Sequence, residues 1–402
     1  MKNWKDDIVA ALSVSFVAIP QALAYATMAG LPAYTGLYAT AVPTIIAALS
    51  GSSTILSTGP VATISLLTAA ALVKYAANPL ELIAAAAVLS MLVGFIQIVL
   101  SIVRAGSLIN FIAHPVLIGF TTAAACIIWF SQVPTLLGVV VSDQPYFYKV
   151  FVETMVNLNS ANVYTATIGI GSIFTVLLLR KFFPHAPAAL IVIIAGALLG
   201  NYLGYAGPIV GDVPRGFRLF ELATMSTINV TGLVSDAFAI AVIGFISGTS
   251  VIKQLAVQSH DKVNPHREMF AQGLANITSG IFGSYPVAGS ISRTALNMAA
   301  GAQSRFASVG TGIVAIIVML FFTPLFYYVN YASLAAIIMV TVAELINFKE
   351  IVRLSTVKGN DGLVALVTLS ATLYFAPHFD IGIMIGVCAA TISKLYKTVR
   401  HL

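Results

Sequence analysis

The sequence predicts an all-α membrane protein of fourteen transmembrane segments, arranged as two inverted repeats of seven. Three observations support this fold class: the composition, the distribution of basic residues, and two interrupted apolar segments at equivalent places in the two halves. Of the 402 residues, 59% are hydrophobic and 8% are charged, whereas soluble domains carry about 25% charged residues. This composition is typical of a protein that crosses the membrane many times.

The apolar segments follow from the thickness of the bilayer. A helix needs about 20 apolar residues to cross it, and fewer where the helix is broken and buried in protein. This rule gives fourteen segments, at 8–29, 36–50, 58–73, 82–103, 113–133, 163–179, 187–204, 234–252, 268–283, 289–302, 307–325, 331–346, 362–376 and 381–396. We expect the two long connections between segments, 134–162 and 205–233, to be extracellular loops with little structure of their own.

The basic residues orient these segments. With the N-terminus in the cytoplasm, fifteen of the 20 Lys and Arg residues fall inside and four, Lys74, Lys149, Arg215 and Arg218, fall outside. This skew follows the positive-inside rule with both termini cytoplasmic. The formal net charge of +6 therefore reflects topology and argues against a nucleic-acid partner. We expect the chain to lie in the lipid bilayer of a cell membrane, a bacterial inner membrane.

Two segments are predicted to enter the membrane as extended chain and to become helical near its middle. In STGPVATIS (57–65), Pro60 follows Thr58 and Gly59, which suits a helix that begins at the proline. In SYPVAGSISRTALN (284–297), a helical run begins near Ile291 after Pro, Gly and Ser. An odd number of spans per half gives the halves opposite orientations, which is the plan of many secondary transporters with a midplane substrate site.

Arg293 is the one basic residue that this topology places inside the membrane. An unpaired arginine at mid-bilayer costs about 2.5–3.5 kcal/mol on insertion scales, whereas two helix N-termini and a guanidinium together form a site for an anion. We interpret Arg293 as a ligand for a transported anion. The alternatives are that Arg293 snorkels or donates to backbone carbonyls of the broken segments, and that Ser290 and Ser292 only allow close helix packing.

Three stretches carry a resemblance to a known family. They are IPQALAYATMAGLPAYTGLYATAVPTIIAALSGSS (19–53), STGPVATISLL (57–67) and AQGLANITSGIFGSYPVAGSISRTALNMAAGAQS (271–304). Together they resemble the hallmark sequences of the SulP anion transporters, the relatives of the animal solute carrier 26 proteins, and the similarity runs along the whole chain.

The resemblance implies a fold shared with nucleobase permeases such as UraA. A mobile core (1–110 and 234–325) would move like an elevator against a gate (111–233 and 326–402) that forms a homodimer, with the anion between the third and tenth segments. In this family the Ser-Arg pair that begins the tenth helix corresponds to Ser292 and Arg293. The matching binding residues elsewhere are Gln21, Tyr25 and Val61, the last through its backbone N–H.

These residues also have plainer interpretations. Gln21 can make an interhelical hydrogen bond, and Tyr25 can be an ordinary core aromatic. Asn276 and Asn297 are expected to tie the second broken segment to its neighbours.

The sequence departs from the family in two places. Where proton-coupled members carry a glutamate on the eighth helix, GFISGTSVIK has Ser247, which favours exchange or uncoupled flux. The second departure is the absence of the cytoplasmic STAS domain that the family normally appends, so we expect a single transport domain over 1–402.

The predicted function is secondary transport of a small inorganic anion, sulfate or a similar oxyanion, with bicarbonate also suited to the site. The alternatives are a proton- or sodium-coupled bicarbonate or dicarboxylate symporter and a channel-like member of the family. A nucleobase permease would use carboxylates that this core lacks. No nucleophile, metal cluster or carboxylate pair lies at membrane depth, so we expect neither an enzyme nor a cofactor.

Overall fold

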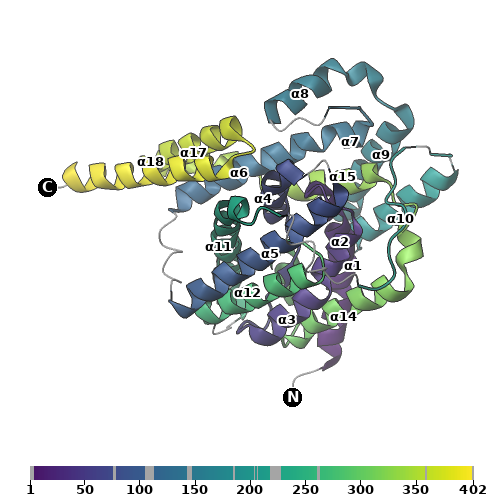
Figure 1. Ribbon diagram of the computed structural model, residues 1–402, viewed down its shortest axis with the longest axis horizontal. Helices are drawn as coiled ribbons and strands as arrows, with labels where there is room; N and C mark the ends of the chain where they lie inside the picture. The colour runs from purple at the N-terminus through teal and green to yellow at the C-terminus, as the bar shows by residue number, and fades with distance from the viewer. Residues whose placement is uncertain are drawn as a thin grey trace.

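The computed structural model describes residues 4–75, 78–104, 113–142, 147–183, 186–202, 204–205, 207–217, 228–259, 263–357 and 360–400. Almost all regular structure in these residues is helical (Figure 1). The helices of the first half are α1 (Trp4–Met28), α2 (Tyr34–Thr40), α3 (Val42–Ser50), α4 (Ala62–Leu72), α5 (Pro79–Ile102), α6 (His114–Ser131), α7 (Val133–Leu137), α8 (Phe147–Val156), α9 (Val163–Phe182) and α10 (Ala188–Tyr202).

The second half begins with α11 (Val234–Ser259), which a short 3-10 turn precedes. Two strands of two residues each, β1 (Thr58–Gly59) and β2 (Ala288–Gly289), are the strands of the described residues. The remaining helices are α12 (Pro265–Ile281), α13 (Ile291–Ala299), α14 (Phe306–Phe321), α15 (Tyr331–Ala343), α16 (Phe348–Val357), α17 (Asp361–Phe375) and α18 (Phe379–Arg400).

Every predicted membrane segment coincides with one or more of these helices. Six helical stretches are long and apolar enough to cross a membrane: 4–28, 79–102, 114–137, 163–182, 231–249 and 331–356. Shorter apolar helices account for most of the remaining predicted segments. The described residues therefore form a mostly helical membrane protein, while the count of fourteen spans stays a prediction.

Local sequence explains where many of the helices begin. The side chains of Asn78, Asn162, Asn264 and Asn330 each accept a hydrogen bond from a backbone N–H in the first turn of α5, α9, α12 and α15. Asparagine is among the best residues at this position because it satisfies an N–H that has no partner within the helix. In α5 and α12 a proline in the first turn follows the asparagine, which suits a position where no N–H is needed.

Three expectations from the sequence are wrong in detail. The third predicted segment becomes helical only at Ala62, with Val61 as the N-cap, instead of at Pro60, because Thr58 and Gly59 pair with another segment as β1. The connection 134–162 is not unstructured, because it contains α7 and the ten-residue helix α8. The second predicted segment is also divided, at Ala41 between α2 and α3, where Pro43 lacks the N–H that a continuous helix would use.

The helices pack in two groups. In the first, α5 lies against α12 and α11, while α3 and α1 lie against α14 (Figure 1). In the second, α17 packs on α18 and α6, and α15 packs on α9. α5 and α12 approach each other closely: a Cβ on Gly94 would lie 2.5 Å from the carbonyl oxygen of Gly273, so only glycine fits. Contacts of α1 with α15 and α10, and of α4 with α6, join the groups.

Candidate functional site

The site is built on two short extended segments, β1 and β2, which pair with each other just before the half-helices α4 and α13. We call this pair of strands the crossing. β1 and β2 pair antiparallel, with Thr58 opposite Gly289 and Gly59 opposite Ala288. The backbone N–H of Ser290 also donates to the carbonyl oxygen of Ser57 at 2.9 Å. Because each strand runs directly into its helix, the pairing brings the N-termini of α4 and α13 to one place.

Side chains hold the crossing in position. The backbone N–H of Val287 donates to Asn276 Oδ1 at 2.7 Å, and Asn276 Nδ2 donates to the carbonyl oxygen of Val287 at 3.1 Å. Asn297 Nδ2 donates to the carbonyl oxygen of Ile55 at 2.9 Å. The prediction that these two asparagines tie the second broken segment to its neighbours is confirmed.

The two helix N-termini differ in their capping. The N-cap of α4 is Val61, which has an extended backbone and no side-chain cap. The N-cap of α13 is Ser290, whose hydroxyl accepts a hydrogen bond from the backbone N–H of Arg293 at 3.4 Å. The first N–H groups of a helix have no partner within the helix and carry a partial positive charge. The α4 terminus therefore offers backbone N–H donors that no side chain caps.

Arg293 lies in the first turn of α13, and its side chain contacts the segment that contains β1. Its side chain is 1% exposed, and its Nη2 donates to the carbonyl oxygen of Pro60 at 2.9 Å. The guanidinium lies directly against Gly59, where a Cβ would meet both terminal nitrogens at 3.0 Å. Arg293 does not snorkel. One of its N–H groups donates to a backbone carbonyl of a broken segment, which is one of the alternatives given in the sequence analysis.

No carboxylate neutralises Arg293 among the described residues. Glu344, in the predicted segment 331–346, pairs with Arg180, and Glu350 pairs with Arg353. Arg293 Nε is buried and makes no hydrogen bond. A guanidinium has five N–H donors. The side chain thus keeps donors and a full positive charge for a further partner.

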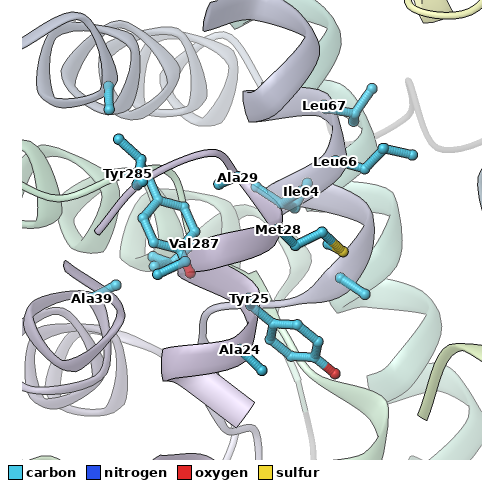
Figure 2. Packing of buried hydrophobic residues seen from close by; sticks show 14 of the residues in the cluster. Ala24, Tyr25, Met28, Ala29, Ala39, Ile64, Leu66, Leu67, Tyr285 and Val287 are labelled. Atoms are coloured by element: carbon cyan, nitrogen blue, oxygen red, sulfur yellow. The ribbon is translucent and has the colours of Figure 1, made fainter. Parts of the chain in front are cut away.

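The other residues predicted for the site come from helices that surround the crossing. Gln21 and Tyr25 lie on α1, which contacts both α4 and α13. Gln21 is buried and its Oε1 has no hydrogen-bond partner. Tyr25 lies within electrostatic range of Arg293. Tyr25 also belongs to the hydrophobic cluster shown in Figure 2, so it is a core aromatic.

The three serines differ in accessibility. Ser290 is buried, Ser247 is half-buried on α11, and Ser292 is exposed, with its hydroxyl 3.5 Å from that of Ser290. α11 packs on β2 so closely that a Cβ on Gly289 would lie 2.8 Å from Gly248 Cα. Ser247 is therefore one residue from the contact between α11 and the crossing.

The sequence interpretation missed two polar residues near the site. The hydroxyls of Tyr285 and Ser65 are buried and approach each other, but neither makes a hydrogen bond of normal geometry. Tyr285 also lies within electrostatic range of Arg293 and Tyr25. Figure 2 shows its ring beside Val287, on the extended segment that leads into β2. The position of Tyr285 directly before Pro286, in the interrupted segment, is the sequence feature that could have identified it.

A cavity of about 490 Å³ lies apart from this crossing. It is bounded by α7, α9, the start of α15 and the residues Tyr205, Gly207 and Pro208, with Thr27 reaching it from α1. None of the residues predicted for the anion site lines it.

Comparison with known proteins identifies the family. The model of the sulfate permease family matches residues 4–368. The chain belongs to this family. Sulfate transporter 4.1, chloroplastic, of Arabidopsis thaliana is 33% identical over 396 residues, which cover 96% of this chain and 57% of the plant protein. The chain thus spans little more than half the length of that relative. The relatives in the family are transporters and not enzymes.

Solved structures share the fold. The murine solute carrier 26 family member A9 anion transporter, in its inward-facing state, has a TM-score of 0.89 at 22% identity, covering 98% of this chain and 68% of that one. The transmembrane domain of the cyanobacterial bicarbonate transporter BicA has a TM-score of 0.85 at 19% identity, covering 96% and 98%. This sulfate permease family member therefore shares the mostly helical membrane fold of these two proteins.

Proposed function

We propose that this protein is a secondary transporter of small oxyanions, sulfate or a similar anion, which binds between the N-termini of α4 and α13. The observation that carries this proposal is Arg293, a buried guanidinium with no carboxylate partner among the described residues. A buried charge needs a compensating charge. A transported anion supplies that charge and also receives the backbone N–H groups of the two half-helices.

Each predicted site residue has a role in this proposal. Arg293 supplies the charge, the N-terminus of α4 at Val61 supplies backbone donors, and Ser290 and Ser292 supply hydroxyls at the start of α13. Gln21 and Tyr25 line the site from α1. A site of this kind favours an anion with several oxygen acceptors, since its donors approach from different segments.

The proposed mechanism is elevator-type alternating access. In this mechanism a core (1–110 and 234–325) that holds both broken segments moves against a gate (111–233 and 326–402). The packing of α5 with α11 and α12, and of α17 with α6 and α18, supports this division. Contacts between the groups run mainly through α1 and α4, which also flank the anion site. Sliding of the core along these contacts would carry the bound anion across the membrane while the gate stays in place.

The proposed lack of proton coupling follows from Ser247. A serine at this half-buried position on α11 cannot take up and release a proton near neutral pH as a carboxylate can. We therefore propose anion exchange or uncoupled flux. The proposal includes fourteen spans as seven plus seven inverted repeats, cytoplasmic termini, a cell-membrane location and a homodimer formed through the gate.

The test is sulfate uptake into liposomes that contain the purified protein. Internal sulfate, bicarbonate or chloride is varied, and a pH gradient is imposed or removed, with vesicles of the Arg293→Ala variant as the control. Uptake that needs an internal anion and ignores the pH gradient supports exchange. Uptake driven by the pH gradient contradicts the role given to Ser247. If the vesicles take up bicarbonate but not sulfate, the proposed substrate is wrong, while the proposed anion site stands.

A further inference from the structure

Two short helices outside the predicted membrane segments resemble each other in their position in the chain and in their pattern of apolar and charged residues. α8 lies between α7 and α9, and α16 lies between α15 and α17, which are equivalent places in the two halves of the gate. Their sequences, FYKVFVETMV and FKEIVRLSTV, align when Tyr148 is matched to Phe348. Lys149 then matches Lys349, Val152 matches Val352, and Glu153 matches Arg353.

Each helix has three faces. At 3.6 residues per turn, positions 148 and 152 lie on one stripe, as do 348 and 352, and these apolar side chains are 53%, 56%, 52% and 62% exposed. Positions 149 and 153, and 349 and 353, form a charged edge beside the stripe. The third face meets the protein.

The protein-facing sides fix how the two helices sit. Thr154 of α8 is buried, and the ring of Phe151 packs edge-on against Phe130 of α6 with centroids 5.4 Å apart. On α16 the corresponding residues Ile351 and Leu354 are buried. Neither apolar stripe can therefore turn inward without breaking these contacts.

The helices that follow α8 and α16 also expose apolar side chains. On α9 the side chains of Val163, Ile170 and Phe174 are exposed on one face, and on α17 those of Leu363, Leu366 and Tyr374 are exposed. Such faces of membrane helices contact lipid. A short helix with an exposed apolar stripe and with charges along one edge has the features of a helix that lies in the membrane interface.

We propose that α8 and α16 are a matched pair of interfacial helices, one in each leaflet, that hold the gate at a fixed depth in the bilayer. Their apolar stripes enter the acyl region and their charged edges lie among the lipid headgroups. Their placement on opposite sides rests on the inverted repeat proposed above. The contact with lipid rests only on the exposed stripes. A gate held at both faces would resist the force of a moving core.

The charged edges differ, and the difference predicts which lipids each helix prefers. On α8, the Ser142 hydroxyl and backbone N–H donate to the Glu153 carboxylate and lower its pKa. Glu153 therefore stays ionised and balances Lys149. The charged residues of α16 are Lys349, Glu350 and Arg353, and Glu350 pairs with Arg353 at 3.3 Å, which leaves the helix with one net positive charge. The remaining positive charge attracts anionic headgroups to α16 and not to α8.

The experiment uses fluorophores on single cysteines in a background that carries Cys126→Ala and Cys388→Ala. Labels at Val152→Cys and Val352→Cys are compared with labels at Glu153→Cys and Arg353→Cys, each one position further round the same helix. In proteoliposomes with nitroxide lipids, we expect several-fold stronger quenching at the two stripe positions. A water-soluble quencher should give the reverse order. Equal quenching at stripe and edge positions would overturn the lipid contact.

Two further measurements complete the test. A membrane-impermeant thiol reagent added to intact cells should modify Glu153→Cys and leave Arg353→Cys unmodified, and modification of both from one side would overturn the opposite placement. Adding phosphatidylglycerol should strengthen lipid quenching at 352 and leave that at 152 unchanged. An equal change at both positions would overturn the proposed lipid preference. Repeating the quenching in the Arg293→Ala background separates this proposal from the transport function, because lipid contact does not require anion binding.

Discussion

Arg293 and Pro60 are joined by a hydrogen bond of 2.9 Å between the guanidinium and a backbone carbonyl. The two residues lie 233 positions apart in the sequence, and each belongs to a segment that begins one of the half-helices. The positive charge that begins α13 is thus held against the start of α4, where the backbone N–H groups converge. In the proposed function, this relationship joins two separate helix ends into one anion site.

The first prediction concerns the charge of Arg293. Arg293→Ala should lower sulfate affinity at least tenfold, since each hydrogen bond to a charged group contributes about 1.5–3 kcal/mol and about 1.4 kcal/mol is tenfold in affinity. Arg293→Lys should retain part of the affinity, because it keeps the charge without the planar fork. Binding is measured with labelled sulfate on detergent-solubilised protein, and a thermal melt verifies that the variants are folded. Unchanged affinity in Arg293→Ala would refute the site.

The second prediction concerns the space that Gly59 leaves. A Cβ at this position would lie 3.0 Å from both terminal nitrogens of Arg293, so Gly59→Ala should displace the guanidinium and weaken sulfate binding. Gly171→Ala is the matched control, because a Cβ there meets no atom within 4 Å and alanine favours the helix by roughly 0.5–1 kcal/mol. Binding to both variants is compared with wild type. The prediction is wrong if Gly59→Ala binds as tightly as Gly171→Ala.

The third prediction concerns the support of β2 by Asn276. Its amide makes hydrogen bonds to both the N–H and the carbonyl of Val287, and all of these groups are buried. Asn276→Ala leaves them unsatisfied at about 1–3 kcal/mol each, so the melting temperature should fall and uptake should be lost. Asn276→Asp keeps the acceptor for the Val287 N–H but not the donor, and should be intermediate. Uptake that survives in Asn276→Ala would show that the crossing forms without this residue.

The fourth prediction concerns proton coupling at Ser247. Ser247→Glu should make sulfate uptake depend on pH. Ionisation of the new carboxylate as pH rises would oppose an anion near Arg293, while protonation at lower pH would remove that repulsion. Uptake should therefore fall with rising pH through the pKa of the introduced group. The neutral variant Ser247→Gln should show the pH profile of wild type. A flat profile in Ser247→Glu would place this position away from the anion.

Several features of this protein follow from short stretches of sequence. The membrane segments were predictable because apolar length is a local property, and all of them coincide with helices. The interruption before α13 was located correctly because Pro286, Gly289 and the capping Ser290 lie within a few residues of one another. The same logic placed the start of α4 two residues too early, because Pro60 resembles a first helical residue but Thr58 and Gly59 belong to a strand whose partner is remote.

The helix α8 was missed for a different reason. Its sequence, rich in Phe, Tyr, Val and Thr, has modest helix propensity, and ten residues are too few to form a stable helix in isolation. Its helical form depends on packing, through Phe151 on Phe130. The alignment with α16 becomes visible only when both segments are known to be helical.

The sequence by itself determined the class of protein and the position of its apolar segments, and it singled out Arg293 as a candidate site residue, because hydrophobic length, helix breakers and an isolated arginine are encoded locally. The tertiary structure decided how those residues meet. It paired β1 with β2, brought Arg293 onto Pro60 and Gly59, left the Tyr285 and Ser65 hydroxyls without normal hydrogen bonds beside them, and formed α8. These contacts join residues far apart in the chain, and their free energy depends on the packing of the whole fold.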